Sequence, residues 1–109
     1  MHLPDSEIVA LYVVFGSRGE AEAIGRAMVE QGLAACVNIL GPCRSIYRWQ
    51  GAVEEADEVA AIFKTQDARA AALMAAIHSA HSYEVPAIVQ LPIAASHADY
   101  RDWIITETR

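Results

Sequence analysis

The sequence has little basic charge and no basic cluster. It holds 8 lysine and arginine residues against 14 aspartate and glutamate residues, for a formal net charge of −6 and a pI near 5.0. Lys and Arg supply most of a protein's affinity for nucleic acids by neutralising phosphates, and they also draw proteins to anionic lipid surfaces. The composition therefore argues against a nucleic-acid partner and against a membrane partner. It is compatible with binding cations.

Long apolar runs and signal-like segments are also lacking. The longest apolar run, Ile8 to Phe15, is far shorter than the roughly 20 residues that span a bilayer. The N-terminus shows no basic stretch followed by an apolar one, so no signal peptide is expected. The two cysteines, Cys36 and Cys43, are too few for a disulfide scaffold. If they share one extended strand, about 23 Å separates them, which forbids a disulfide between them. These features predict a cytoplasmic protein.

What the chain does have is apolar residues, which make up 54% of its 109 positions and suffice for the core of one domain spanning residues 1–109. A continuous apolar run predicts a central strand buried on both faces, and later segments alternate between helical and extended spacing. Strands are expected at 8–15, 34–49, 52–64 and 85–93, and helices after residue 20, at 68–80 and after 96–99. This order is that of an α+β, ferredoxin-like βαββαβ sandwich with a C-terminal helix.

Short motifs mark the expected ends of these elements. Ser17 and Glu20 have the spacing of a capping box, in which each side chain bonds a free N–H group at a helix start. Gly32 is placed to end the helix that follows, and Gln50-Gly51 to form a tight hairpin turn. Further caps are expected at 65–67 and 96–99, and an irregularity of the return strand at 54–57.

The predicted hairpin is too long for its own domain. Fully extended, residues 34–49 would span about 50 Å, whereas a compact domain of this size is about 34 Å across. Its tip carries Ile46, Tyr47 and Trp49, which a single chain would expose to water. Exposed apolar strands invite pairing, and closed symmetry among copies of the chain would cover every tip at once. Tyr47 and Trp49 share one face, while Arg48 points the other way, where a carboxylate such as Glu58 of another copy could pair with it.

Five motifs in order make the sequence resemble the CutA family of divalent-cation tolerance proteins over nearly its whole length. They are residues 33–38 (LAACVN), residues 45–51 (SIYRWQG), Glu58 with Lys64-Thr65, residues 81–86 (HSYEVP), and Tyr100 with Trp103. The resemblance implies a ferredoxin-like protomer in a homotrimer that is assembled like the PII signalling proteins, with long hairpins pairing between subunits. It also implies a role in tolerance to divalent cations, and some bacterial members bind copper.

The resemblance points to His81 as the first candidate metal ligand, since imidazole suits copper and zinc. In copper-binding bacterial members the site is similar to a cysteine at the end of the first strand plus a His-His pair before the last strand. The matching positions here are Phe15, Ala80 and His81, so two of the three ligands are replaced. Cys36 is a second candidate. The alternatives are a helix-terminal histidine favoured by the helix dipole and a buried, apolar Cys36.

By resemblance to the family, Glu58, Lys64 and Tyr83 are expected in a cleft between subunits. Glu58 and Lys64 stand six apart in one strand and so share a face, which allows an ion pair. The alternative is that the cleft binds a small anionic ligand. Tyr47, Arg48 and Trp49 are expected at the trimer interface.

These observations predict a non-enzymatic trimer in divalent metal (copper) homeostasis, with copper or another divalent metal as the expected cofactor. The alternative is a PII-like sensor that binds a small anion between subunits. A third hypothesis, a small hydrolase, lacks a nucleophile with its base. The loop at 16–19 could bind phosphate at a helix N-terminus, but a capping turn explains it better.

Overall fold

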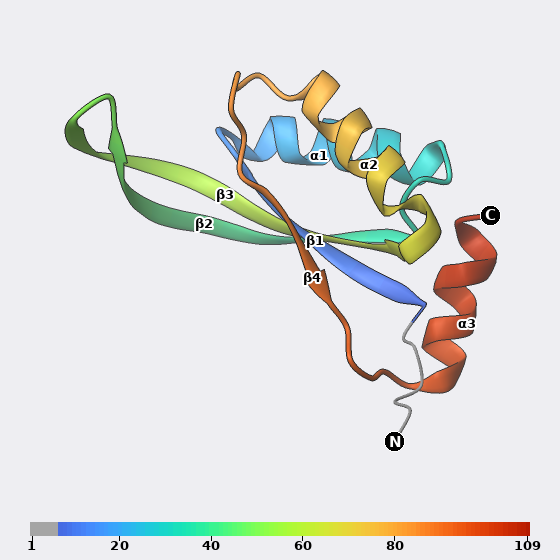
Figure 1. Cartoon of the computed structure of the whole chain (residues 1–109). Coiled ribbons are helices and arrows are strands. Elements are labelled where there is room, and N and C mark those ends of the chain that lie inside the picture. Colours follow the sequence, from blue (N-terminus) through green and yellow to red (C-terminus); the bar gives the residue numbers. More distant parts are fainter. Residues whose placement is uncertain (1–6) are drawn as a thin grey trace.

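The computed structural model describes residues 7–109, which form a four-stranded sheet and three helices (Figure 1). The strands are β1 (Ile8–Phe15), β2 (Cys36–Trp49), β3 (Ala52–Gln66) and β4 (Ile88–Pro92), and the helices are α1 (Arg18–Glu30), α2 (Asp67–Ala80) and α3 (Ala98–Glu107). The predicted order of elements is confirmed. No helix in this part of the chain has the length and apolar character to cross a membrane. The expected lack of a signal peptide concerns residues 1–6, which lie outside the described residues.

The sheet has the strand order β2-β3-β1-β4, and every neighbouring pair is antiparallel. This is the ferredoxin-like arrangement predicted from the pattern. The apolar run of β1 takes a central position, where seven of its eight residues are buried. Burial on both faces explains why the run shows no alternation of polar and apolar residues.

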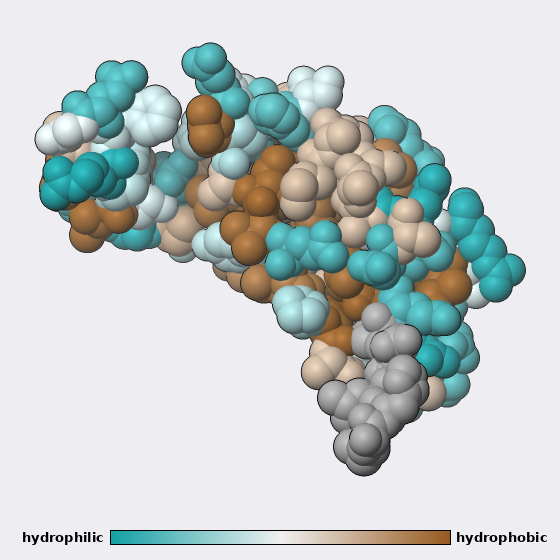
Figure 2. Space-filling view, viewed as in Figure 1, coloured by the Kyte–Doolittle hydropathy of each residue, from teal (hydrophilic) through white to brown (hydrophobic). Residues whose placement is uncertain are grey.

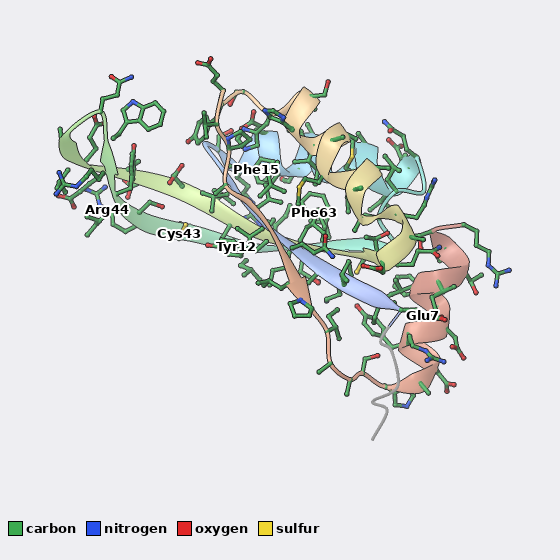
Figure 3. All side chains as sticks on the ribbon, in the orientation of Figure 1. Glu7, Tyr12, Phe15, Cys43, Arg44 and Phe63 are labelled. Carbon is green, nitrogen blue, oxygen red and sulfur yellow. The ribbon has the colours of Figure 1, made fainter. Side chains whose placement is uncertain are left out.

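Helices α1 and α2 lie side by side on one face of the sheet (Figure 1). The core beneath them holds alternate residues of β1, including Phe15, whose ring lies 6.3 Å from that of Phe63 in β3 (Figure 3). Helix α3 packs separately at one end of the sheet, where Ile104 is buried against Ile8 and Ala35. The face opposite α1 and α2 therefore has only α3 at its end as cover within residues 7–109.

The helix ends follow the predicted motifs only in part. Ser17 caps α1 as expected, because its hydroxyl oxygen accepts a hydrogen bond from the Glu20 N–H at 3.2 Å. The Glu20 carboxylate instead accepts the Ser82 N–H at 2.9 Å. Gly32 follows the helix with a φ of +71°, which confirms its role as a stop. Helices α2 and α3 begin where caps are predicted, at 65–67 and 96–99, since their N-cap residues are Gln66 and His97, but neither side chain bonds the helix N–H groups.

The Gln66 side chain instead contacts α3: its amide nitrogen donates to the backbone oxygen of Thr108 at 2.8 Å and to the Thr108 hydroxyl at 3.1 Å. This ties the end of α3 to the start of α2. Such a long-range side-chain contact leaves no trace in local spacing, which explains why the sequence suggested a cap.

The hairpin turn forms as predicted, with φ values of +50° at Gln50 and +84° at Gly51. The predicted irregularity at 54–57 is wrong, because that segment of β3 pairs in continuous register with β2. The register shift lies in β2 instead, between Ile39 and Gly41, and Gly41 has a φ of +103°. A glycine tolerates this backbone conformation, which is typical of a β-bulge.

Two further details differ from the prediction. The acidic residues of β3 stay in the ladder because Arg44, on the projecting part of the hairpin (Figure 3), bridges Asp57 at 3.0 Å and Glu55 at 3.3 Å. The last strand is shorter than 85–93, and its pairing with β1 begins only where the Val14 N–H donates to the Ala87 oxygen.

The hairpin projects beyond the rest of the molecule, as the length argument predicts (Figure 1). The molecule measures 45 × 34 × 22 Å along its principal axes. Its radius of gyration is 14.8 Å, against about 13 Å for a compact domain of this length. Near the tip, Ile46 is 67% exposed, Val53 64% and Trp49 45%. One chain thus leaves a large apolar surface on its hairpin.

The close approach of α1 to β2 yields a stability prediction. A Cβ added to Gly25 would lie 2.9 Å from Cγ1 of Val37, whereas one added to Gly19 would meet nothing within 4 Å. We expect Gly25→Ala to lower the free energy of unfolding by about 1–3 kcal/mol through overpacking. Gly19→Ala, in the same helix, should raise it by about 0.5–1 kcal/mol, since alanine loses less backbone entropy on folding. Denaturant titration at matched protein concentration measures both, and equal effects of the two variants would contradict the close packing.

Candidate functional site

The predicted site residues fall into two groups, near opposite ends of the part of β3 that pairs with β1. Glu58 and Tyr83 lie at one end, and Lys64 lies near the other end with Cys36 as its register partner in β2. Six residues of a strand span about 20 Å. Glu58 and Lys64 share a face as expected, but the ion pair predicted between them is wrong. Each has another partner: Glu58 bonds Tyr83, and Lys64 bonds Asn38.

At the first end, the Tyr83 hydroxyl donates a hydrogen bond of 2.7 Å to the Glu58 carboxylate, which is buried. Partial burial is the largest cause that raises the pKa of Tyr83, followed by this hydrogen bond and the carboxylate charge, and together they bring it to about 12. Gly16 makes room for the contact, because a Cβ there would lie 3.0 Å from the Tyr83 hydroxyl oxygen. The buried carboxylate is thus held by a neutral phenol.

His81 is buried beside this pair, and both nitrogens of its ring are in use. Nε2 lies 2.8 Å from the Val14 carbonyl oxygen, and Nδ1 lies 3.0 Å from the Tyr83 backbone nitrogen. A carbonyl only accepts and a backbone N–H only donates, so Nε2 carries the proton and Nδ1 accepts. His81 is the C-cap residue of α2. Metal ligation by His81 would require one of these two hydrogen bonds to break.

Phe15 stands where copper-binding bacterial members have a cysteine, and its role here is packing. Its ring stacks on the His81 ring, with centroids 5.0 Å apart and planes inclined by 11°. The Glu20 carboxylate holds the next residue through the Ser82 N–H. Partial burial acts to raise the pKa of Glu20, but the hydrogen bonds from Ser82, together with smaller contributions from His81 and Gly16, make the net shift downward. Residues 81–83 are thus fixed by contacts from β1, α1 and β3.

At the second end, Lys64 joins a cluster on the face opposite α1 and α2. Its ammonium nitrogen lies 2.8 Å from Oδ1 of Asn38 and 5.6 Å from the centroid of the Tyr100 ring. The Tyr100 hydroxyl in turn lies 3.5 Å from the Cys36 sulfur, and its ring stacks on Trp103 at 5.8 Å. Burial and the contact with Cys36 raise the pKa of Tyr100, while Lys64 acts in the opposite direction.

This cluster was not predicted as a unit. The sequence placed Lys64 with Glu58 and left Cys36 as either a metal ligand or a buried apolar residue, whereas Cys36 is half-buried and contacts a hydroxyl. Asn38 and Tyr100 were missed, although both lie in motifs that carry the family resemblance. The contact between Cys36 and Tyr100 joins residues that are 64 positions apart in the chain, so only the packing of α3 on the sheet brings them together.

Metal ligands are not gathered within the described chain. Residues 7–109 contain no group of three His, Cys, Asp or Glu side chains arranged to hold a metal ion. Cys36 and Cys43 are free thiols in the same strand, as the spacing argument predicts. Tyr47, Arg48 and Trp49 are all exposed on the hairpin, and their expected role at a subunit interface stays a prediction.

A four-stranded antiparallel sheet with two helices on one face, a projecting hairpin and a fixed loop before β4 defines a small ferredoxin-like protein. Residues 9–107 match the family model described as "CutA1 divalent ion tolerance protein". The chain belongs to this family, which confirms the resemblance found in the sequence.

Individual relatives agree with this assignment. The chain is 44% identical over 88 residues to the divalent-cation tolerance protein CutA of Thermus thermophilus, covering 81% of this chain and 85% of that protein. It is 38% identical to mouse protein CutA over 109 residues, which cover 98% of this chain and 61% of the relative. The chain thus spans about three fifths of the length of the mouse and human relatives.

Solved structures show the same fold. The CutA structure from Archaeoglobus fulgidus, described as a periplasmic divalent cation tolerance protein, superposes with a TM-score of 0.90 at 35% identity, over 94% of this chain and 99% of that one. CutA from Xylella fastidiosa reaches a TM-score of 0.92 at 29% identity, over 94% of this chain and 99% of that one.

The Tyr83–Glu58 contact predicts a dependence of stability on alkaline pH. The pKa of Tyr83 is raised to about 12 in the folded protein, above the value of about 10 in an unfolded chain. The folded state therefore holds this proton more tightly, so the stabilisation is complete below pH about 10 and is lost as the pH rises toward 12. Tyr83→Phe should lose less stability over this range, as measured by denaturant titration at each pH.

Tyrosinate absorbance supplies an independent measure. The chain has four tyrosines, and Tyr83→Phe should remove a transition near the alkaline end of the titration. Tyr12→Phe is the matched control, since Tyr12 is not among the groups that shift the pKa of Tyr83, and it should leave that transition in place. An unchanged titration curve in Tyr83→Phe would contradict the buried hydrogen bond.

Proposed function

We propose that the protein works as a non-enzymatic homotrimer in tolerance to divalent cations, with copper as the principal metal. The observation that carries this proposal is the amount of apolar surface that one chain leaves uncovered. Exposed large hydrophobic residues lie on the hairpin and before and within β4; among them are Leu40, Ile46, Tyr47, Trp49, Val53, Val85, Val89 and Leu91. Hydrophobic surface also gathers around β4 in Figure 2. Exposed apolar surface of this extent marks contacts between proteins.

Backbone geometry supports copies of the same chain as the cover. β2 and β4 are the edge strands of the sheet, and β2 runs for 14 residues. An edge of that length presents a row of outward N–H and C=O groups that favours pairing with another strand. A closed ring satisfies all such edges with one type of contact. The trimer is the ring that the family resemblance implies.

The metal role is inferred from the family and from relatives such as the Thermus protein, which is described as a divalent-cation tolerance protein. His81 uses both ring nitrogens, and residues 7–109 hold no assembled ligand group. We therefore propose that a bound metal takes ligands from more than one subunit, with the half-buried Cys36 thiol as a soft ligand that suits copper. A cytoplasmic location, which keeps such thiols reduced, belongs to the same proposal.

A small-anion sensor of the PII type is the second candidate function. It is favoured by Lys64, whose ammonium has an amide and an aromatic ring as partners and forms no ion pair within residues 7–109. The predicted cleft of Glu58, Lys64 and Tyr83 would require two subunits, since Glu58 and Lys64 lie about 20 Å apart along β3.

Charge placed on the exposed apolar surface should disrupt the assembly. We expect Trp49→Glu and Leu91→Glu each to yield smaller species in light scattering coupled to size exclusion, because a carboxylate in an apolar interface is costly to bury. Val29→Glu is the matched control, since Val29 is 39% exposed on α1, outside this surface, and should leave the mass unchanged. A wild-type protein with the mass of one chain would defeat the proposal.

Metal binding between subunits predicts that binding depends on the assembly. Titration calorimetry with Cu²⁺ and with Zn²⁺ should show binding to the assembled protein and none to the dissociated Leu91→Glu variant, because each site draws on more than one copy. Cys36→Ser should weaken copper binding, while His81→Gln, which keeps an N–H donor toward Val14, should leave it unchanged. Loss of binding in His81→Gln would assign the site to His81 instead.

A further inference from the structure

The positive charge of the Lys64 ammonium forms no ion pair with a carboxylate of residues 7–109. Lys64 is the only lysine among the 109 residues, in a sequence with a net charge of −6. The ion pairs among residues 7–109 are made by Arg18, Arg44 and Arg101. Lys64 is half-buried, and burial of an ammonium without a counter-charge is costly. The surroundings of this one residue therefore favour the arrival of an anion.

Hydrogen-bond donors converge around the ammonium. Oδ1 of Asn38 accepts from Lys64 at 2.8 Å, which leaves the NH₂ group of the same amide as a donor. The Tyr100 hydroxyl and the Cys36 sulfur lie 3.5 Å apart, and one of them donates a hydrogen bond to the other. The group that accepts this bond keeps its own hydrogen available for a ligand. The cluster thus combines one positive charge with neutral donors from β2 and α3.

The ammonium is also accessible. In the sheet, Lys64 stands between Ala10 of β1 and Cys36 of β2, both of which have small side chains. Asn38 is exposed, and Tyr100 is 37% exposed. The buried carboxylate of Glu58 lies about 20 Å away along the strand and repels an incoming anion little.

We propose that Lys64, Asn38 and Tyr100 form a binding site for a small oxyanion, a carboxylate or a phosphate group, with Cys36 at its edge. The oxyanion accepts charge-assisted hydrogen bonds from the Lys64 ammonium and further bonds from the Tyr100 hydroxyl and the Asn38 amide. This inference rests on the second candidate function and locates its ligand. It differs from the predicted cleft in excluding Glu58 and Tyr83 from the ligand's contacts within one subunit.

The single lysine provides a direct probe of this site. In the assembled protein labelled with ¹³C-lysine, the side-chain methylene next to the ammonium gives one lysine signal. Titration with inorganic phosphate, and separately with acetate, at ionic strength held constant with chloride, should move this signal along a saturable curve. The two anions distinguish a phosphate ligand from a carboxylate ligand.

Two conservative variants test the proposed contacts. Tyr100→Phe keeps the ring over the ammonium but removes the hydroxyl, and it should bind about tenfold more weakly, as expected for one lost hydrogen bond to a charged group. Asn38→Asp places a carboxylate beside Lys64 and should abolish saturation. Gln31→Glu makes the same charge change at the exposed end of α1 and should bind as the wild type does.

The outcomes separate this site from the functions proposed above. A lysine signal that does not saturate, or that moves equally with chloride, overturns the site, as does wild-type binding by Asn38→Asp. If calorimetry detects phosphate or acetate binding while the lysine signal stays still, the sensor function stands and this site is wrong. The trimer and its metal binding are measured independently and survive either result.

Discussion

A β-sheet has two faces, and the helices α1 and α2 of this chain cover one of them. The apolar run of β1 is buried on both sides, yet beside it the uncovered face presents Val89 and Leu91 of β4 to water. Helix α3 shields only the end of that face. The polar cluster of Lys64, Asn38 and Tyr100 therefore lies on the face of the sheet that α1 and α2 leave uncovered, beside α3.

The fold could be predicted because its determinants are local. A strand with no polar residue, a stop at Gly32 and a Gln50-Gly51 turn each act within a few residues, and the structure has all three. The misplaced irregularity shows where this fails. An acidic run predicts exposure, but Arg44 on the facing strand balances Asp57 and Glu55, so the ladder continues and the bulge falls at a glycine instead.

The candidate site was predicted less well because its contacts are distant in sequence. Resemblance identified His81, Lys64 and Tyr83 as residues of interest, but not their partners. His81 is committed to Val14 and to the loop that follows it, a role that neither its residue type nor its place after a helix reveals. Lys64 meets Tyr100 only because α3 returns to the sheet. Motifs thus found the positions, whereas their chemistry depends on tertiary packing.

The extra residue in β2 decides which way the hairpin aromatics point. Before the shift, Cys36 faces the same side as Lys64; after it, the odd-numbered Tyr47 and Trp49 stand opposite Glu54 and Ala52, on that same side. Side chains alternate along a strand, so a β2 without the insertion would turn both rings toward the helical layer. The single added residue near Gly41 thus reverses which face of the sheet each later side chain of β2 occupies. It places the aromatic side chains near the hairpin tip on the same side as the uncovered face of the sheet.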